Sequence, residues 1–125
     1  MSVILIAEDD LALQSALRDT IRKKGYEVIV ANNGQEALDA VSVQKPDLIL
    51  LDIMMPVKDG LETLEQLKSD PETRAIPVLI LTNYGYGFLR ENAQYGGAVD
   101  YLIKSDDSLH VILDKIYAIL PPPTV

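Results

Sequence analysis

Polar side chains that could perform chemistry follow short apolar runs at several places in this 125-residue chain. Carboxylates, a hydroxyl and an ammonium held together match the needs of phosphoryl transfer to a carboxylate nucleophile, which depends mainly on positioning and electrostatics. In chain order they are Glu8, Asp9 and Asp10 after residues 3–7, Asp52 after residues 48–51, Thr82 after residues 78–81, and Lys104 after residues 99–103.

The acidic members of this set need compensation if they converge. Glu8, Asp9 and Asp52 would repel one another unless one is protonated or a cation binds. The chain has no cysteine, and its one histidine, His110, is expected on the last helix, away from this edge. The available ligands are therefore oxygens, which favour Mg²⁺ over zinc or copper, with Mn²⁺ as a substitute.

Each polar group also has a simpler interpretation when it is considered singly. Asp10 is then a helix cap, Thr82 a turn hydroxyl and Lys104 a surface charge. The repetition of a polar residue at the end of successive apolar runs favours a shared functional site instead.

The elements that must position these groups alternate along the chain. Short runs rich in branched apolar residues predict strands over 3–7, 26–31, 48–51, 78–81 and 99–103. Apolar side chains at three- and four-residue spacing predict helices over 13–21, 35–43, 61–67 and 109–119, with a weaker one over 88–95. The side chains of Ser105, Asp106 and Asp107 are candidates for the N-terminal cap of the last helix.

Five strand–helix alternations favour an α/β fold, a parallel sheet with helices on both faces. In such sheets ligands bind at the carboxyl ends of the strands, near the reversal of strand order. The candidate residues all follow those ends. We therefore expect them to meet at one edge of the sheet.

Length and composition restrict the class of protein. We expect one domain over residues 1–120 and a proline-rich tail or linker start over 121–125. The net charge of −8 disfavours direct binding to nucleic acid or to anionic lipid. The start of the chain lacks the pattern of a signal peptide, and no apolar run is long enough to span a membrane, so a cytoplasmic location is expected.

Together these residues resemble the receiver domain of bacterial two-component response regulators. The resemblance runs from Val3 to about Leu120. Its motifs are Ile4 to Asp10, Asp47 to Pro56, Asp59-Gly60, Leu81-Thr82 and Asp100 to Lys104. It implies a flavodoxin-like doubly wound fold with five helices and a five-stranded parallel sheet of order 2-1-3-4-5.

The resemblance also implies a role for each matching residue. Asp52 is the expected phosphoacceptor, and Lys104 and Thr82 contact the phosphoryl group. Tyr101 is the expected switch aromatic. Magnesium is expected on Asp9, Asp52 and the main-chain carbonyl of Met54, with Glu8 acting through water.

The implied activity is signalling rather than metabolic catalysis, with phosphotransfer and dephosphorylation that the domain itself promotes. The expected phosphodonor is a sensor histidine kinase or a histidine phosphotransfer protein. The expected output is a changed surface on the fourth helix, fifth strand and fifth helix, which a downstream effector reads. A phosphorylation-dependent homodimer is left open.

Several positions depart from the family pattern. Ser105 follows Lys104 where the family usually has proline, which leaves the isomer of that peptide bond open. Lys58 replaces a frequent methionine. Asn83 and Tyr84 follow Thr82 where a small residue is usual, and we hypothesise that they slow hydrolysis of the phosphorylated form. Unchanged dephosphorylation after their replacement by small residues would refute this.

Three alternatives remain at this point. A degenerate receiver would act only through protein contacts. An aspartate-nucleophile phosphatase would need a second aspartate at the position of Met54, and would hydrolyse an added phosphate ester continuously. A flavin-binding module would need a phosphate-binding first loop where this chain has Glu8, Asp9 and Asp10.

Overall fold

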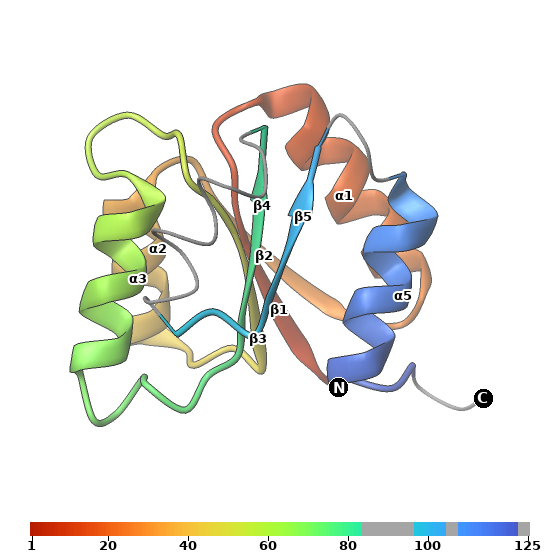
Figure 1. The fold of residues 1–125 in the computed structure, drawn as a ribbon. Helices are drawn as coiled ribbons and strands as arrows, with labels where there is room; N and C mark the ends of the chain where they lie inside the picture. Colours follow the sequence, from red (N-terminus) through yellow and green to blue (C-terminus); the bar gives the residue numbers. More distant parts are fainter. Residues whose placement is uncertain (84–96, 105–107, 123–125) are drawn as a thin grey trace.

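Three strands, over residues 3–7, 48–52 and 78–82, consist mainly of branched apolar residues that are buried along their whole length, as in most parallel sheets. The computed structural model describes residues 1–83, 97–104 and 108–122. Its strands are β1 (Val3–Ala7), β2 (Glu27–Ala31), β3 (Leu48–Asp52), β4 (Val78–Thr82) and β5 (Asp100–Ile103). They form one parallel sheet in the order β2-β1-β3-β4-β5 (Figure 1), which confirms the predicted fold class and strand order.

The helices of the described residues cover the two faces of this sheet. They are α1 (Leu11–Lys23), α2 (Gly34–Val43), α3 (Gly60–Ser69) and α5 (Leu109–Ile119). Helices α2 and α3 lie on one face, and α1 and α5 lie on the other (Figure 1). The fifth predicted helix, over residues 88–95, lies outside the described residues. None of the described helices is long and apolar enough to cross a bilayer.

Alternate residues of each strand supply two separate apolar cores. In β1, for example, Ile4 and Ile6 pack towards α1 and α5, whereas Leu5 and Ala7 pack towards α2 and α3. The central strands β1 and β3 are therefore apolar at every position until the chain reaches their carboxyl ends. This placement leaves the carboxyl edge as the place where polar side chains can enter the sheet.

Side-chain caps determine where these helices begin. Asp10, Asn33, Asp59 and Ser108 each accept a hydrogen bond from a main-chain N–H in the first turn of α1, α2, α3 and α5. The cap predicted for the last helix within residues 105–107 is wrong, because Ser108 has the extended backbone of a cap and its hydroxyl accepts from Val111 N.

Four strand boundaries differ from the predicted ones by one residue, and the third and fourth strands each extend one residue further, to Asp52 and Thr82. The second strand begins at Glu27 rather than Tyr26, and the fifth begins at Asp100 rather than Val99. Tyr26 instead packs in the core beside α5, and its hydroxyl donates to the carbonyl of Leu120 at 2.5 Å. This bond joins the start of β2 to the end of α5.

Candidate functional site

The end of β1 delivers one buried and one exposed acid to the carboxyl edge of the sheet. Glu8 follows the last residue of β1, and only 1% of its surface is exposed. Its main-chain N–H continues the sheet by donating to the carbonyl of Ala31 at 3.0 Å. The side chain of Glu8 accepts from Asp10 N at 3.0 Å. Asp9, the next residue, is exposed to solvent.

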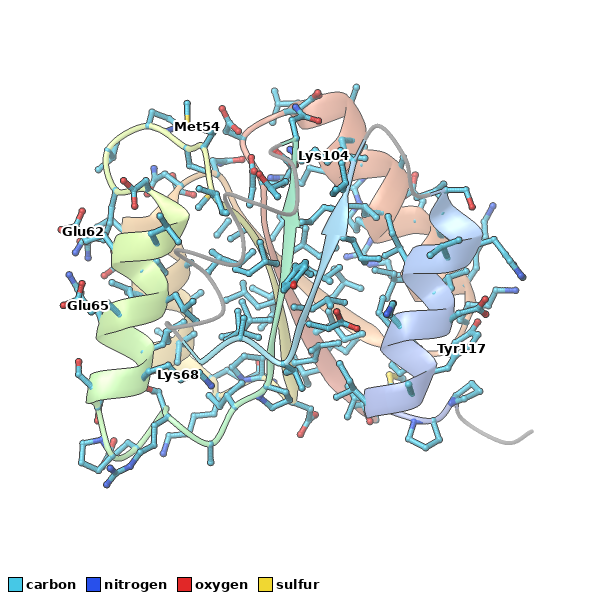
Figure 2. All side chains as sticks on the ribbon, viewed as in Figure 1. Met54, Glu62, Glu65, Lys68, Lys104 and Tyr117 are labelled. Atoms are coloured by element: carbon cyan, nitrogen blue, oxygen red, sulfur yellow. The ribbon has the colours of Figure 1, made fainter. Side chains whose placement is uncertain are left out.

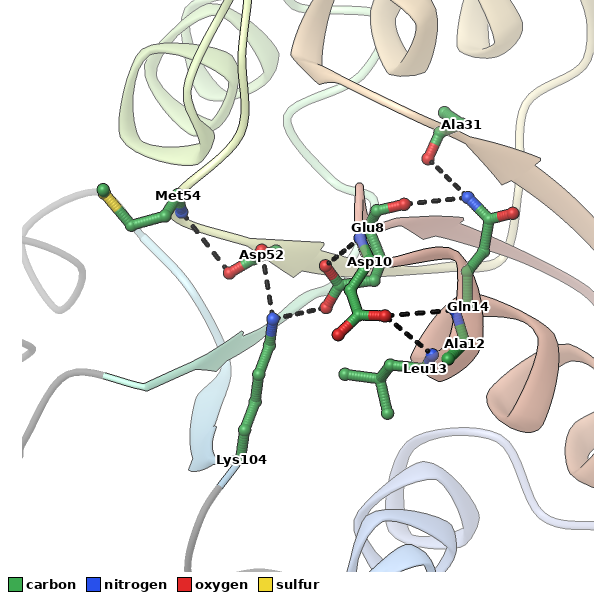
Figure 3. Close-up of polar contacts among 9 residues, drawn as sticks. All are labelled: Glu8, Asp10, Ala12, Leu13, Gln14, Ala31, Asp52, Met54 and Lys104. Atoms are coloured by element: carbon green, nitrogen blue, oxygen red, sulfur yellow. Dashed lines mark hydrogen bonds and ion pairs between the residues drawn. The ribbon is translucent and has the colours of Figure 1, made fainter.

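Asp52, the last residue of β3, and Lys104, which directly follows β5, meet Glu8 at this edge (Figure 3). Asp52 is also buried, with 4% of its surface exposed. The ammonium nitrogen of Lys104 lies 2.5 Å from Glu8 Oε1 and 3.1 Å from Asp52 Oδ2. One cation thus bridges two buried carboxylates that would otherwise repel each other.

Burial raises the pKa values of the two buried acids in this cluster. It raises the pKa of Glu8 to about 7, although the hydrogen bond from Lys104 acts in the opposite direction. Burial likewise raises the pKa of Asp52. For Lys104 burial favours the neutral amine, but the contacts with Glu8 and Asp52 outweigh it and hold the pKa above its usual value. Near neutral pH, the cluster therefore contains an ammonium and two acids, of which Glu8 is close to its midpoint.

Three carboxylates at this edge are close enough to share a metal ion. Glu8, Asp9 and Asp52 each offer an oxygen within 4.8 Å of the others. An all-oxygen donor set of this kind suits a hard cation such as Mg²⁺. The predicted ligands Glu8, Asp9 and Asp52 are thus brought together, and their chemistry fits the ion that was expected from the sequence.

Met54 lies on the loop that leaves β3 (Figure 2). Its side chain points into solvent, and its main-chain N–H donates to Asp52 Oδ1 at 3.3 Å. Lys104 lies at the same end of the sheet as Met54, whereas Lys68 lies towards the opposite end (Figure 2). The main chain of Met54 is therefore adjacent to the carboxyl cluster.

Thr82 and Tyr101 lie on the neighbouring strands β4 and β5. Thr82 is the last residue of β4 and is fully buried, and its carbonyl accepts from Lys104 N at 2.7 Å. Tyr101 is half-buried and packs against the core on the α2 and α3 face. Asn83 is exposed directly after Thr82, whereas Tyr84 and Ser105 lie outside the described residues. The hypothesis about Asn83 and Tyr84 stays a prediction.

Asp10 is a helix cap, which is the simpler of the two interpretations that the sequence allowed. Its carboxylate accepts from Ala12 N at 3.0 Å and from Leu13 N at 3.3 Å, so it caps α1 (Figure 3). We expect Asp10→Ala to lower the free energy of unfolding by about 1 kcal/mol while leaving the carboxylate cluster in place. Urea unfolding followed by far-UV circular dichroism measures this.

Asp19→Ala is the matched control, because Asp19 is exposed on the same helix and forms a surface ion pair with its neighbour Arg18 at 3.2 Å. That change should cost less than about 0.5 kcal/mol. Equal losses for the two variants would contradict the capping role of Asp10.

The raised pKa of Glu8 predicts that metal-free protein loses stability as the pH rises. With a pKa of about 7 in the folded state and 4.5 in the unfolded state, Glu8 binds more protons when folded. Its contribution is complete below the unfolded value and disappears as the pH rises through about 7. The unfolding free energies of wild type and Glu8→Gln are measured in chelator at about pH 5 and about pH 8. Relative to Glu8→Gln, wild type should lose about 1–3 kcal/mol of stability between the lower and the higher pH.

A divalent cation that binds at this site would compete with the proton on Glu8. Added Mg²⁺ should therefore raise the melting temperature of wild type more at about pH 8 than at about pH 5. A pH-independent difference between wild type and Glu8→Gln would contradict the burial of a protonated Glu8.

Sequence reasoning missed Gln14, which lies beside this cluster. It is one of the buried polar residues, with 5% of its surface exposed, and it belongs to α1. Its position three residues before Leu17 and seven before Ile21 lies on the inward stripe of that helix. A polar residue on an otherwise apolar stripe was the available signal.

Comparison with known proteins agrees with this geometry. The family model of the response regulator receiver domain matches residues 4–114. The chain belongs to this family. It is also similar to the polar-differentiation response regulator DivK of Brucella anthropi, with 41% identity over 101 residues, 81% of this chain and 82% of DivK.

Other relatives of this receiver domain are longer. The transcriptional regulatory protein PdtaR of Mycobacterium tuberculosis is 36% identical over 102 residues, which are 81% of this chain but only 48% of PdtaR. The chain thus spans about half the length of that relative. Among solved structures, the receiver domain of the sensor histidine kinase PA1611 of Pseudomonas aeruginosa superposes with a TM-score of 0.85 at 27% identity, over 94% of this chain and 96% of that chain. That structure has a magnesium ion coordinated in its active-site cleft.

Proposed function

We propose that this receiver domain accepts a phosphoryl group on Asp52 from a phosphohistidine of a partner protein. The observation that carries the proposal is the buried carboxylate of Asp52 at the end of β3, 3.1 Å from the Lys104 ammonium and within 4.8 Å of Glu8 and Asp9. A carboxylate of this kind can serve as a nucleophile when neighbouring positive charge compensates the approaching phosphoryl oxygens.

The transfer follows from the chemistry of the donor. A carboxylate oxygen of Asp52 attacks phosphorus, a P–O bond forms and the P–N bond of the phosphohistidine breaks. The electron pair of the broken bond goes to the imidazole nitrogen, which takes a proton from solvent. Hydrolysis later releases inorganic phosphate and regenerates the Asp52 carboxylate, so the domain acts as a switch rather than as a metabolic enzyme.

Other residues of the site would orient and neutralise the reacting groups. Lys104 would move from its two carboxylates to a phosphoryl oxygen, and the hydroxyl of Thr82 would donate to another. Glu8, Asp9, Asp52 and the carbonyl of Met54 would hold Mg²⁺, which neutralises charge on the phosphoryl oxygens when bound. Tyr101 on β5 would pass the change to the surface formed with α5.

The partners and setting of this activity follow from the family. A sensor histidine kinase or a histidine phosphotransfer protein would supply the phosphoryl group, and an effector protein or domain would read the output surface. The acidic charge of −8 supports contacts with proteins rather than with nucleic acid or membrane. The proposal also includes a cytoplasmic location and one domain over residues 1–120, with the proline-rich residues 121–125 outside it.

Intact-mass spectrometry tests the proposal directly. The protein is incubated with acetyl phosphate in the presence and absence of Mg²⁺. We expect one added phosphoryl group that requires Mg²⁺, is absent from Asp52→Ala and persists in the exposed control Asp19→Ala. If no phosphoryl group is added by acetyl phosphate or by a phosphohistidine donor, and if Mg²⁺ does not bind, the chain is a degenerate receiver.

A further inference from the structure

Gln14 is the buried side chain that contacts the carboxyl edge of the sheet from α1. Its amide nitrogen donates to the carbonyl of Glu8 at 2.8 Å and to the carbonyl of Ala31 at 3.3 Å (Figure 3). It also donates to Oδ1 of Asn32 at 2.9 Å. The two N–H bonds of this amide share three acceptors, which offset the cost of burying it.

Two hydrogen bonds hold the main chain of Glu8, one at its N–H and one at its carbonyl. The Glu8 N–H already donates to the carbonyl of Ala31, which fixes the near side of the residue to β2. The far side lies beyond the last residue of β1, and there the Glu8 carbonyl receives its hydrogen bond from Gln14. The Gln14 amide therefore helps to fix the main-chain direction at Glu8, whose carboxylate also accepts from Asp10 N and contacts Lys104.

Further hydrogen bonds hold the acceptor side chain of Asn32. Its main-chain and side-chain nitrogens donate to Oε1 of Glu36 at 3.1 and 3.2 Å. The N–H of Glu36 in turn donates to the α2 cap, Asn33, at 2.8 Å. Gln14 is thus part of a connected polar network that joins α1, the ends of β1 and β2, and the start of α2.

An anchoring role for α1 alone does not account for this arrangement. Leu17 and Ile21 already bury the inner face of α1, and an apolar side chain at position 14 would extend that face but would remove the hydrogen bond to the Glu8 carbonyl. The amide instead directs all its described hydrogen bonds to the residue that carries the buried carboxylate and to the neighbouring end of β2.

We propose that Gln14 is a positioning residue that sets the affinity of the site for Mg²⁺ by fixing Glu8. The inference rests on the proposed function of the site, because it takes Glu8 as part of the metal-binding set. Residues that orient metal ligands without touching the metal typically change metal affinity by about 10- to 100-fold when they are replaced.

Isothermal titration calorimetry with Mg²⁺ on the metal-free protein gives the first readout. Gln14→Leu keeps a side chain of similar size and removes the amide, so its dissociation constant for Mg²⁺ should rise by about tenfold or more. Gln66→Leu is the matched control, because Gln66 is exposed on α3, and its dissociation constant should stay within about twofold of wild type. Gln14→Asn keeps the amide on a shorter side chain, and its dissociation constant for Mg²⁺ should lie between those of Gln66→Leu and Gln14→Leu. This variant provides the test if Gln14→Leu does not fold.

Phosphorylation by acetyl phosphate as a function of Mg²⁺ concentration gives the second readout. The Mg²⁺ concentration at half-maximal rate should rise in Gln14→Leu, whereas the rate at saturating Mg²⁺ should stay within about threefold of wild type, because the reacting groups are intact. A general structural defect would lower the saturating rate without moving the half-maximal concentration.

The outcomes separate this inference from the function on which it rests. A folded Gln14→Leu with wild-type Mg²⁺ affinity, or one that loses only its saturating rate, overturns the role of Gln14. If wild type binds Mg²⁺ but takes no phosphoryl group from any donor, phosphotransfer fails while a weakened Mg²⁺ affinity in Gln14→Leu still supports the positioning role. If wild type binds no Mg²⁺, both proposals are wrong.

Discussion

Lys104→Met should abolish most phosphorylation while making Mg²⁺ bind more tightly. The ammonium of Lys104 contacts Glu8 at 2.5 Å and Asp52 at 3.1 Å, so it compensates the charge of both acids in the metal-free protein. Methionine keeps much of the side-chain length without the charge. The acids then gain more from a divalent cation, and the Mg²⁺ dissociation constant at about pH 8 should fall by about tenfold, since one lost charge interaction is worth on the order of 1–2 kcal/mol.

The phosphorylation rate should change in the opposite direction. In the proposed transfer the ammonium of Lys104 stabilises the phosphoryl group, and the loss of such a group costs about 100- to 1,000-fold in rate. Acetyl phosphate labelling at saturating Mg²⁺ measures this rate, and calorimetry measures the affinity. Parallel losses of affinity and rate would contradict the bridging role of Lys104.

The same variant should also be unstable when it is free of metal. Removing one partner of a buried ion pair costs about 3–5 kcal/mol at pH values where both acids are charged. The loss should be smaller at about pH 6, where Glu8 takes up a proton in compensation. Lys115→Met is the control, because Lys115 pairs with Asp100 at 2.6 Å in a more exposed position, and it should cost less than about 1 kcal/mol and leave phosphorylation unchanged.

The sheet was predictable because its information is local. Each apolar run of β1, β3 and β4 is buried along its whole length, and each ends at a polar residue or is followed by one. Parallel strands bring their carboxyl ends to one edge, so the meeting of Glu8, Asp52 and Lys104 followed from the order of elements.

The cap of the last helix was harder to predict than the sheet. Ser108 and the three residues before it all offer suitable oxygens, and the sequence alone does not show which of them has the extended backbone of a cap and a hydroxyl or carboxylate that accepts from the first turn.

The pairing within the site was not predictable from the order of elements. The sequence indicated that converging acids need a proton or a cation, but it did not indicate that Lys104 would bridge Glu8 and Asp52. That contact depends on the direction of a long side chain and on how far each carboxylate is buried. Gln14 was missed for a related reason, because its three acceptors come from Glu8, Ala31 and Asn32, on elements that are separated along the chain.

Gly60→Ala should disrupt the site although residue 60 carries no functional group. Gly60 is the first residue of α3, its N–H donates to the carbonyl of Ile53 at 2.8 Å, and its Cα lies against the main chain of β3. A Cβ at this position would overlap the carbonyl oxygen of Asp52 and crowd Ile53, and both obstacles are backbone atoms.

The backbone of Asp52 or the start of α3 must therefore move, and the loop that carries Met54 lies between them. We expect the free energy of unfolding to fall by about 3 kcal/mol, at the upper end of the range for overpacked sites. Phosphorylation and Mg²⁺ affinity should fall with it, because the proposed function assigns Asp52 and Met54 to both. Chemical denaturation, acetyl phosphate labelling and calorimetry on the same preparation measure the three effects.

Gly97→Ala separates crowding from the ordinary cost of losing a glycine. Gly97 has a φ of 89°, in the left-handed region, and among the described residues the atoms nearest to a Cβ there belong to the flexible stem of Lys68, at 3.4 Å or more. Alanine should cost about 1 kcal/mol through backbone strain and leave phosphorylation intact. If Gly60→Ala cost no more than Gly97→Ala and kept its phosphorylation rate, the close approach of α3 to Asp52 would not be needed to position the phosphoacceptor.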